Sequence, residues 1–150
     1  MRAIVQRVTE ARVWVDDRVT GEIAHGLLVL VGVGRKDGLE DVRYIVSKIR
    51  GARLFEGSDG ERMDRSVVDV HGAILVVSQF TLYGDLRKGR RPSFDEAAVP
   101  KSARSLYEDL VRELRAIPLP VATGEFQAIM CVELVNKGPI TLLIDSARQF

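Results

Sequence analysis

Polar residues follow a run of five apolar residues near the middle of the chain. Residues Ala73 to Val77 are all apolar, and Ser78-Gln79-Phe80-Thr81-Leu82 comes next. If the strand stays regular, Gln79 and Thr81 point to one face of the sheet, where a polar pair would line a cleft. The same segment also reads as an edge strand that enters a loop. On its own, it slightly favours this second interpretation.

A glycine-proline pair stands between two apolar segments near the end of the chain, within Asn136-Lys137-Gly138-Pro139. Proline has no N–H to donate to a strand ladder, and a Gly-Pro bond adopts the cis form at modest cost. A simple turn is the default interpretation of this segment when it is taken alone.

Basic residues cluster in a segment that reads as a loop, from Tyr83 to Phe94. The chain as a whole carries 22 Lys plus Arg against 21 Asp plus Glu, a formal charge of +1. Overall charge therefore does not indicate a nucleic-acid partner, and such a partner must be met by a local patch. The candidates for phosphate contact are Arg87, Lys88, Arg90 and Arg91, and a solvated surface loop is the alternative interpretation.

Other residue types that could do chemistry are few. His25 and His71 each precede a glycine, so turn positions explain them, and neither has a partner at a metal-ligand spacing. Cys131 is the single cysteine and cannot form an intrachain disulfide or a metal site alone; its apolar neighbours predict a buried side chain. The sequence indicates no metal and no organic cofactor.

The periodicity of apolar residues predicts many short strands and two helices. Alternation and apolar runs predict strands at Ala3–Val8, Ala11–Val15, Val19–Ala24, Leu27–Val33, Ala73–Val77, Ala128–Val135 and Ile140–Ile144. Apolar residues three or four apart predict helices at Leu39–Arg50 and Lys101–Ala116. We therefore expect an α/β fold, a mostly antiparallel β-barrel-like sheet with two main flanking helices.

Length and hydropathy predict one domain, residues 1–150, because ordinary domains run about 100–200 residues. The longest apolar run, Leu27–Val33, is far shorter than the ~20 residues that cross a bilayer. The N-terminal residues lack the apolar core of a secretion signal. We expect a cytoplasmic protein with no membrane partner.

The two segments that opened this section together resemble the signatures of the D-aminoacyl-tRNA deacylase (D-tyrosyl-tRNA(Tyr) deacylase) family. Ser78-Gln79-Phe80-Thr81-Leu82 matches the first signature, and Asn136-Lys137-Gly138-Pro139-Ile140-Thr141 matches the second. The likeness extends to Gln6-Arg7-Val8, to Val19–Ile23 with Gly26–Leu30, and to Arg91-Pro92-Ser93-Phe94, and so covers nearly the whole chain.

The resemblance implies a homodimer that hydrolyses the ester between a D-amino acid and the 3′ end of tRNA, with its active sites at the subunit interface. It implies that a cis Gly138-Pro139 bond reaches into the partner's site, binds the α-ammonium group and excludes L side chains. Arg7 is implied to orient this motif, and Asn136 and Met130 are further substrate-binding candidates. Glycine has no side chain, so glycyl-tRNA, mischarged on tRNA(Ala), is an expected second substrate.

For the chemical step, the resemblance assigns catalysis to Ser78, Gln79, Phe80 and Thr81; the local charge of Arg87, Lys88, Arg90 and Arg91 makes these four residues the candidates for tRNA binding. We expect backbone N–H groups around Gln79 and Phe80 to stabilise the oxyanion. Thr81 is the obvious nucleophile but no neighbouring base is apparent, so activation of water by the ribose 2′-OH is favoured. Two alternatives stay open: an editing hydrolase of the same fold that clears an L-amino acid, and a non-catalytic RNA-binding barrel.

Overall fold

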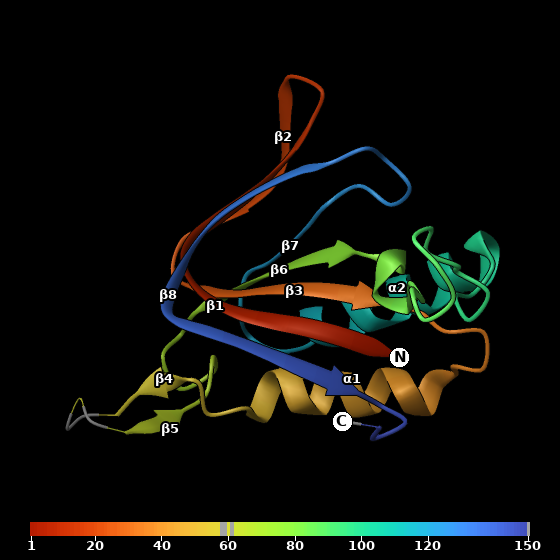
Figure 1. Ribbon diagram of the computed structural model, residues 1–150. Helices are drawn as coiled ribbons and strands as arrows, with labels where there is room; N and C mark the ends of the chain where they lie inside the picture. Colours follow the sequence, from red (N-terminus) through yellow and green to blue (C-terminus); the bar gives the residue numbers. More distant parts are fainter. Residues whose placement is uncertain (58–59, 61, 150) are drawn as a thin grey trace.

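The computed structural model describes residues 1–57, 60 and 62–149, and Figure 1 shows a strongly curved sheet with two helices outside it. The elements in chain order are β1 (Arg2–Val15), β2 (Arg18–Ile23), β3 (Gly26–Gly32), α1 (Leu39–Gly51), β4 (Phe55–Glu56), β5 (Met63–Arg65), β6 (Ala73–Ser78), the 3₁₀ turn η1 (Phe80–Tyr83), α2 (Pro100–Arg115), β7 (Val121–Thr123) and β8 (Cys131–Asp145). The predicted α/β class, barrel-like sheet and two flanking helices are confirmed.

The main sheet has the order β2-β1-β3-β6-β7, and β8 pairs with β1 along most of its length. Strand β1 is antiparallel to β2, β3 and β8, whereas the β3-β6 and β6-β7 pairs are parallel. The parallel pairs arise because α1 and α2 lie in the crossovers that lead from β3 to β6 and from β6 to β7. The sheet is therefore mixed, with an antiparallel majority among its described pairings.

Two pairs of predicted strands are single long strands in the structure. Residues 2–15 form β1 without a break, and residues 131–145 form β8 through the segment predicted to be a turn. The register of the β1-β8 pair shifts between Gln6 and Val8 and again between Val8 and Glu10. Such irregularities bend a strand without ending it. In the sequence, the interrupted alternation resembles a boundary between two strands. The short elements β4, β5, β7 and η1 were not predicted.

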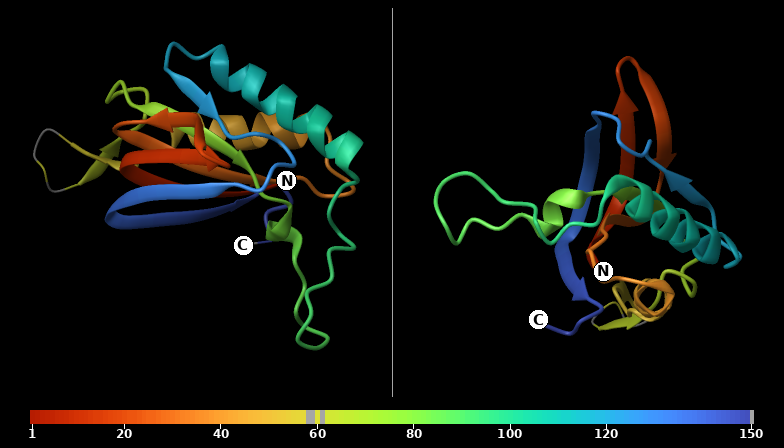
Figure 2. Two further views of the ribbon diagram at one scale, coloured as in Figure 1. Left: turned by 90° about the horizontal axis from the view of Figure 1, so that it is seen from above. Right: turned by 90° about the vertical axis from the view of Figure 1, so that its right-hand side faces the viewer.

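The sheet curls until its two ends, β2 and β7, meet, as the right-hand view of Figure 2 shows. A Cβ atom on Gly21 of β2 would lie 2.3 Å from the backbone oxygen of Thr123 in β7. Only glycine permits this approach of two backbones. Gly21 thus allows the barrel to close nearly completely.

Two apolar clusters fill the fold, one on each side of the sheet. Leu27, Val29 and Val31 of β3 join the cluster between the sheet and the helices, while Leu28 of the same strand joins the cluster inside the barrel. Burial on both faces is typical of a central strand in a sheet covered by helices. Strand β3 is consequently held from both faces beside the site described below.

The helices cover the outer face of the sheet. The Asp41 carboxylate accepts a hydrogen bond from the Gly38 N–H (2.8 Å) at the start of α1, and α2 starts at Pro100, a favoured first residue of a helix. Their buried residues repeat every three or four positions: Val42, Ile45 and Ile49 in α1, and Tyr107, Leu110 and Leu114 in α2. Across the described residues, no helix is long and apolar enough to cross a membrane.

The prediction that Cys131 is buried was wrong, because its side chain is exposed at the start of β8. Strand β8 pairs with β1 at one edge, and its residues alternate between exposed and half-buried over this region. An apolar run therefore did not mean burial here, since one face of β8 has no described element upon it.

Candidate active site

The 3₁₀ turn η1 follows β6 directly and is held against the end of β3. Ser78 pairs with Val31 at the end of the parallel ladder, and the Gln79 N–H donates a hydrogen bond to the Val31 carbonyl (2.7 Å). A Cβ atom on Gly32 would lie 2.9 Å from the Gln79 oxygen. The glycine at this position therefore lets the turn lie directly on β3.

A cavity of about 660 Å³ opens beside this turn. Ser78, Gln79 and Phe80 form one side of it, and Met130 lies among the residues that line the rest. The remaining walls come from the end of β3, the first turns of α2 and the segment before β8, with small or apolar side chains that include Val33, Ala98, Ala103, Tyr107 and Phe126. An apolar cavity edged by a few polar groups is the usual form of a small-molecule site.

Three of the four predicted catalytic residues line the cavity, and Thr81 does not. The Thr81 side chain is exposed, and its hydroxyl accepts a hydrogen bond from the Gln79 side-chain amide. An amide donor cannot remove a proton from a hydroxyl, so the contact does not activate Thr81 as a nucleophile.

The backbone amides predicted to face the oxyanion differ in availability. The Gln79 N–H already donates to Val31, whereas Phe80 is the first residue of the turn. The first N–H groups of a helical turn have no acceptor within the turn. The Phe80 N–H is therefore the better candidate of the two. The Phe80 ring packs against that of Phe94 (centroids 4.9 Å apart).

The Gly138-Pro139 peptide bond is cis, and both residues are exposed in a bulge of β8. Gly138 has a φ of 131°, a conformation that favours glycine. The Asn136 side chain closes the bulge: its oxygen accepts from the Ile140 N–H (2.9 Å), and its amide donates to the Thr141 hydroxyl (3.0 Å).

Arg7 fixes the bulge from the neighbouring strand. Its side chain is buried, and Nε donates to the Lys137 carbonyl (3.1 Å) while Nη1 donates to the Leu54 carbonyl (2.7 Å). The planar guanidinium can serve both acceptors at once. Arg7 thus ties the bulge to the segment that precedes β4.

Sequence patterns did not indicate Glu56 at this bulge, and they explained His25 by a turn position alone. Glu56 lies 3.7 Å from the Arg7 guanidinium and 3.8 Å from the Lys137 ammonium. Partial desolvation, followed by the positive charges of Lys137 and Arg7, lowers the pKa of His25 below 6.5. No local pattern could have indicated that Glu56 and His25 lie near the bulge, because their neighbours in space are far away in the chain.

The bulge and the cavity lie at different ends of the sheet within one chain. Arg7 is opposite Leu27, which pairs with Ile74, whereas Ser78 lies four residues further along β6. That offset alone is about 13 Å, and β8 is separated from β6 by two intervening strands. Neither Gly138 nor Pro139 lines the cavity.

The basic loop carries all four predicted tRNA-binding residues: Arg87, Lys88, Arg90 and Arg91. It projects from the body of the molecule, as the left-hand view of Figure 2 shows, and all four side chains are exposed. Asp85 and Ser93 exchange backbone hydrogen bonds at its base (2.8 and 2.9 Å). Hydrogen bonds from Arg87 lower the pKa of Asp85 to about 2, so this carboxylate is ionised and partly neutralises the Arg87 charge.

Comparison with known proteins gives a consistent result over the full chain. The sequence model of a family described as D-Tyr-tRNA(Tyr) deacylase matches residues 4–145. The chain is 56% identical to the D-aminoacyl-tRNA deacylase of Koribacter versatilis and 54% identical to that of Thermotoga petrophila, with all of both chains covered in each case.

Two solved structures share the fold of this chain. A structure named c-Myc DNA Unwinding Element Binding Protein superposes with a TM-score of 0.92 at 36% identity, covering 97% of this chain and 98% of that one. A structure described as a probable eukaryotic D-amino acid tRNA deacylase superposes with a TM-score of 0.79 at 18% identity, over 95% and 97% of the two chains. The second likeness shows a shared fold.

Proposed function

This chain belongs to the D-Tyr-tRNA(Tyr) deacylase family, and from that premise we propose that it hydrolyses D-aminoacyl-tRNA in a site completed by a second copy of itself. The observation that carries the proposal is the distance, within one chain, between the Gly138-Pro139 bulge and the cavity beside η1. The Gly138-Pro139 bulge is rigidly held but lies away from the cavity beside η1. A two-fold dimer can bring the bulge of one copy to the cavity of the other.

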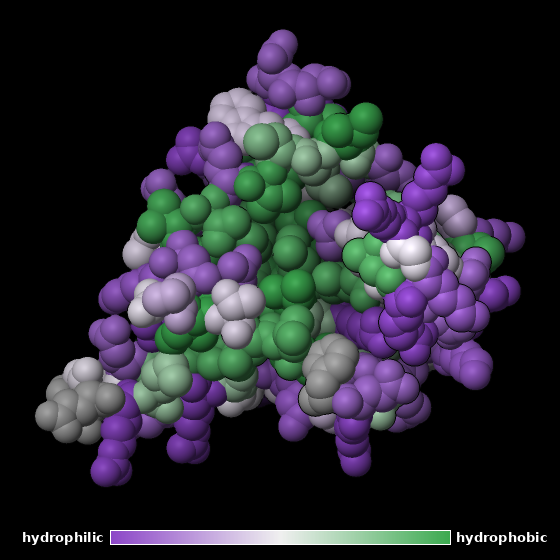
Figure 3. Space-filling model, in the orientation of Figure 1, coloured by the Kyte–Doolittle hydropathy of each residue, from purple (hydrophilic) through white to green (hydrophobic). Residues whose placement is uncertain are grey.

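Exposed apolar side chains support such a dimer. Val135, Leu142 and Leu143 of β8 and Ile129 before it are between 40% and 94% exposed. Figure 3 shows an apolar area running across the face that carries β8. A contiguous exposed apolar area of this kind is typical of a protein interface.

The bulge is suited to read chirality at the α-carbon. An enzyme that removes many D-amino acids cannot depend on their side chains, so it must contact groups that all of them share. Backbone carbonyls of Gly138 and Pro139 would accept hydrogen bonds from the substrate's α-ammonium and leave no space for an L side chain. Glycine has no side chain for the bulge to exclude, which makes glycyl-tRNA, including that mischarged on tRNA(Ala), a second substrate.

The chemical step is attack of water on the ester carbonyl. The Phe80 N–H stabilises the oxyanion that forms, a contribution of about 3–4 kcal/mol for such a donor in known acyl-transfer enzymes. The terminal ribose 2′-OH orients or activates the water, since, within the described residues, the Thr81 hydroxyl accepts a hydrogen bond from the Gln79 amide, which is not a base. The carbonyl then re-forms, the C–O bond to the ribose 3′-oxygen breaks, and that oxygen takes a proton.

Contact with the rest of the tRNA is assigned to the basic loop. Its four cations project toward solvent, where a phosphate backbone can reach them. Because single-stranded and duplex RNA release counterions on binding, reversal of these charges should weaken binding and reduce its dependence on salt.

Mixing two inactive variants tests the shared site. Gly138→Ala places a side chain at a φ of 131° and disturbs the bulge, and Ala103→Trp fills the cavity. Each homodimer should be inactive on D-tyrosyl-tRNA. A mixture refolded at equal amounts contains heterodimers with one intact site and should regain about a quarter of wild-type activity.

Two results would contradict the shared site. One is a mixture that forms heterodimers, as shown by mass spectrometry, and stays inactive. The other is a wild-type protein that sediments as a monomer and is fully active at that concentration.

A further inference from the structure

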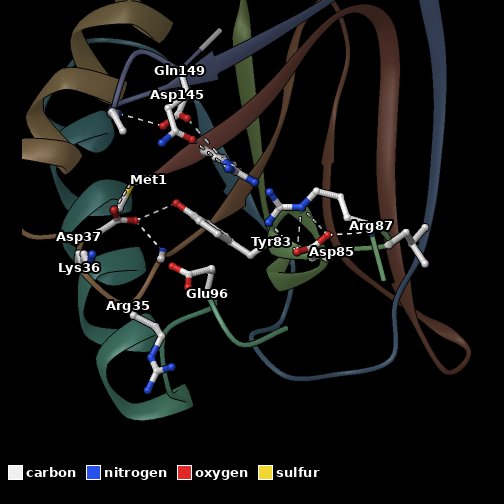
Figure 4. A pocket seen from close by; sticks show the side chains of 15 residues that line it. Met1, Arg35, Lys36, Asp37, Tyr83, Asp85, Arg87, Glu96, Asp145 and Gln149 are labelled. Atoms are coloured by element: carbon white, nitrogen blue, oxygen red, sulfur yellow. Dashed lines mark hydrogen bonds and ion pairs between the residues drawn. The ribbon is translucent and has the colours of Figure 1, made fainter. Parts of the chain in front are cut away.

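A second hollow, of about 850 Å³, lies on the other side of η1 from the cavity and has no role in the reaction described above. Its walls include Arg35 and Lys36 from the loop after β3, Tyr83 and Gly84 from the end of η1, and Glu96. Figure 4 shows the Tyr83 ring between Asp37 and the Asp85–Arg87 pair, with Glu96 beside the ring and Arg35 at the edge.

The wall between the two hollows is very thin. Val33 lines the cavity and Gly34 the second hollow; Ala97 lines the cavity and Glu96 the second hollow. The two segments are joined by a hydrogen bond from the Arg35 N–H to the Glu96 carbonyl (2.9 Å) and by a bridge between Gly34 and Ala97. The four residues of η1 complete this wall and span about 8 Å.

The floor of the second hollow is fixed by hydrogen bonds. The Asp37 carboxylate accepts from the Gly34 N–H (2.6 Å) and the Tyr83 hydroxyl (3.3 Å) and lies 2.6 Å from the Met1 ammonium. The Arg2 guanidinium donates to the Leu82 carbonyl (3.0 Å) and lies over the Tyr83 ring. The hollow is therefore a preformed part of the fold.

Two cations at the edge of the hollow, Arg35 and Lys36, could meet an anion; the Arg35 guanidinium also donates a hydrogen bond to the Asp95 carbonyl (2.9 Å), and the Glu96 carboxylate lines the same hollow. The carboxylates of Asp37, Asp85 and Asp145 lie in ion pairs with Met1, Arg87 and Arg2, respectively. Within the described part of the chain, no ion pair involves Arg35 or Lys36, and both side chains are exposed at the edge of the hollow. A phosphate group is the anion that the proposed substrate would bring there.

We propose that this hollow binds the nucleotide that precedes the aminoacylated adenosine of the tRNA, with its phosphodiester against Arg35 and Lys36. The inference rests on the proposed function, which places the terminal adenosine and its ester at the cavity. An RNA strand that leaves the cavity over η1 must cross a wall one turn thick, a span that one nucleotide can bridge. The lining of the hollow combines charged groups with apolar surface, which suits a nucleotide with its phosphate and its base.

Binding of two stable analogues tests this inference. The first analogue carries a D-tyrosyl group joined by an amide to the 3′ position of adenosine. The second carries the same group joined by an amide to the 3′ position of the dinucleotide CpA, which is the end of natural tRNAs. The wild type should bind the CpA analogue roughly tenfold more tightly or better, because hydrogen bonds to charged groups contribute this much. Fluorescence titration or NMR would give both dissociation constants.

The variant R35A/K36A should lose most of this preference, so that the ratio of the two constants falls toward one. Binding of the CpA analogue should also depend less on salt in the variant. The matched control is K48A/R50A, which removes two exposed cations at the far end of α1 and should keep the wild-type ratio. Circular dichroism and thermal unfolding would show that both variants fold.

Three results would overturn the inference: equal affinities of the wild type for the two analogues, a preference that persists in R35A/K36A, or binding of neither analogue. Hydrolysis of D-tyrosyl-tRNA, measured separately, tests the proposed function. An enzyme that is active on D-tyrosyl-tRNA but has no preference for the CpA analogue would therefore contradict the second hollow alone.

Discussion

The Nε of Arg7 donates a hydrogen bond to the backbone carbonyl of Lys137, the residue that directly precedes Gly138. Arg7 is 5% exposed, and its Nη1 donates a further hydrogen bond to the Leu54 carbonyl. A buried cation that serves two backbone acceptors fixes the position of both. The geometry of the Gly138-Pro139 bulge therefore depends on a residue that lies 130 positions before Lys137 in the chain.

Replacement of Arg7 by lysine should impair discrimination between D and L substrates. The lysine ammonium keeps the positive charge but cannot donate to both carbonyls as the planar guanidinium does. One buried carbonyl therefore loses its donor, at a cost of about 1–3 kcal/mol in unfolding free energy. The hydrolysis rates of D- and L-tyrosyl-tRNA and the urea unfolding curve would be measured together. The control Arg12→Lys alters an arginine of the same strand whose ion pair with Glu133 is exposed, and should change stability by less than about 1 kcal/mol.

An Arg7→Lys protein with wild-type selectivity would show that the bulge does not need this arginine. Equal losses in Arg7→Lys and Arg12→Lys would point to a general effect of strand β1 rather than to the Lys137 contact.

Thr81→Ala should retain hydrolysis within about tenfold of the wild-type kcat, because the lost hydroxyl lies outside the cavity and contacts the Gln79 amide. Single-turnover hydrolysis of D-tyrosyl-tRNA measures this directly. Thr81→Ser is the matched control, since it keeps the hydroxyl. A folded Thr81→Ala enzyme without activity, beside an active Thr81→Ser enzyme, would make Thr81 the nucleophile.

The pKa of His25 reports the charges around the bulge. Glu56 raises this pKa, whereas desolvation, Lys137 and Arg7 lower it. Glu56→Gln should therefore lower the His25 pKa further, and Lys137→Met should raise it; an NMR titration of the imidazole protons would measure both. Opposite shifts would mean that these side chains do not lie near His25 in solution.

The lowered pKa of His25 predicts how the free energy of unfolding changes with pH. Because the folded-state pKa of His25 lies below 6.5, the unfolded chain binds more protons near this value. The contribution of His25 is therefore present above pH 6.5 and is lost as pH falls through the folded-state pKa. In His25→Gln, the slope of unfolding free energy against pH should be smaller over this range.

Alkaline pH should destabilise the fold through its buried tyrosines. The Tyr107 hydroxyl donates to the Val76 carbonyl (3.0 Å), and burial raises the pKa of Tyr107 to about 12. Burial also raises the pKa of Tyr83. The unfolded chain loses these protons first, so stability should fall as pH rises above about 10. Tyr107→Phe should flatten the decline; an unchanged slope would contradict the assignment to Tyr107.

Periodic elements of the fold could be predicted from sequence because their signals are local. The repeat of Val42, Ile45 and Ile49 and the alternation along β1 depend on residues that are near one another in the chain. The continuity of β1 and β8 could not be predicted, since the bulge opposite Arg7 is set by the pairing of residues more than 120 positions apart. The parallel β3-β6 pair likewise depends on the crossover through α1.

The candidate site was predictable in its two signatures and not in its geometry. Sequence identified Ser78–Thr81 and Asn136–Pro139, but it could not show that Thr81 lies outside the cavity or that the Gln79 N–H is held by Val31. The contacts of Glu56 with Arg7 and Lys137 join three distant parts of the chain, so no local sequence pattern indicates them.

The central claim is that the protein removes amino acids from tRNA according to chirality at the α-carbon. The direct measurement follows release of amino acid from D-tyrosyl-, L-tyrosyl- and glycyl-tRNA, with equal enzyme and the same tRNA body for the two tyrosyl esters. We predict rapid release of D-tyrosine, release of glycine, and an intact L-tyrosyl ester. Equal release of D- and L-tyrosine, or preferential release of L-tyrosine, would contradict the account.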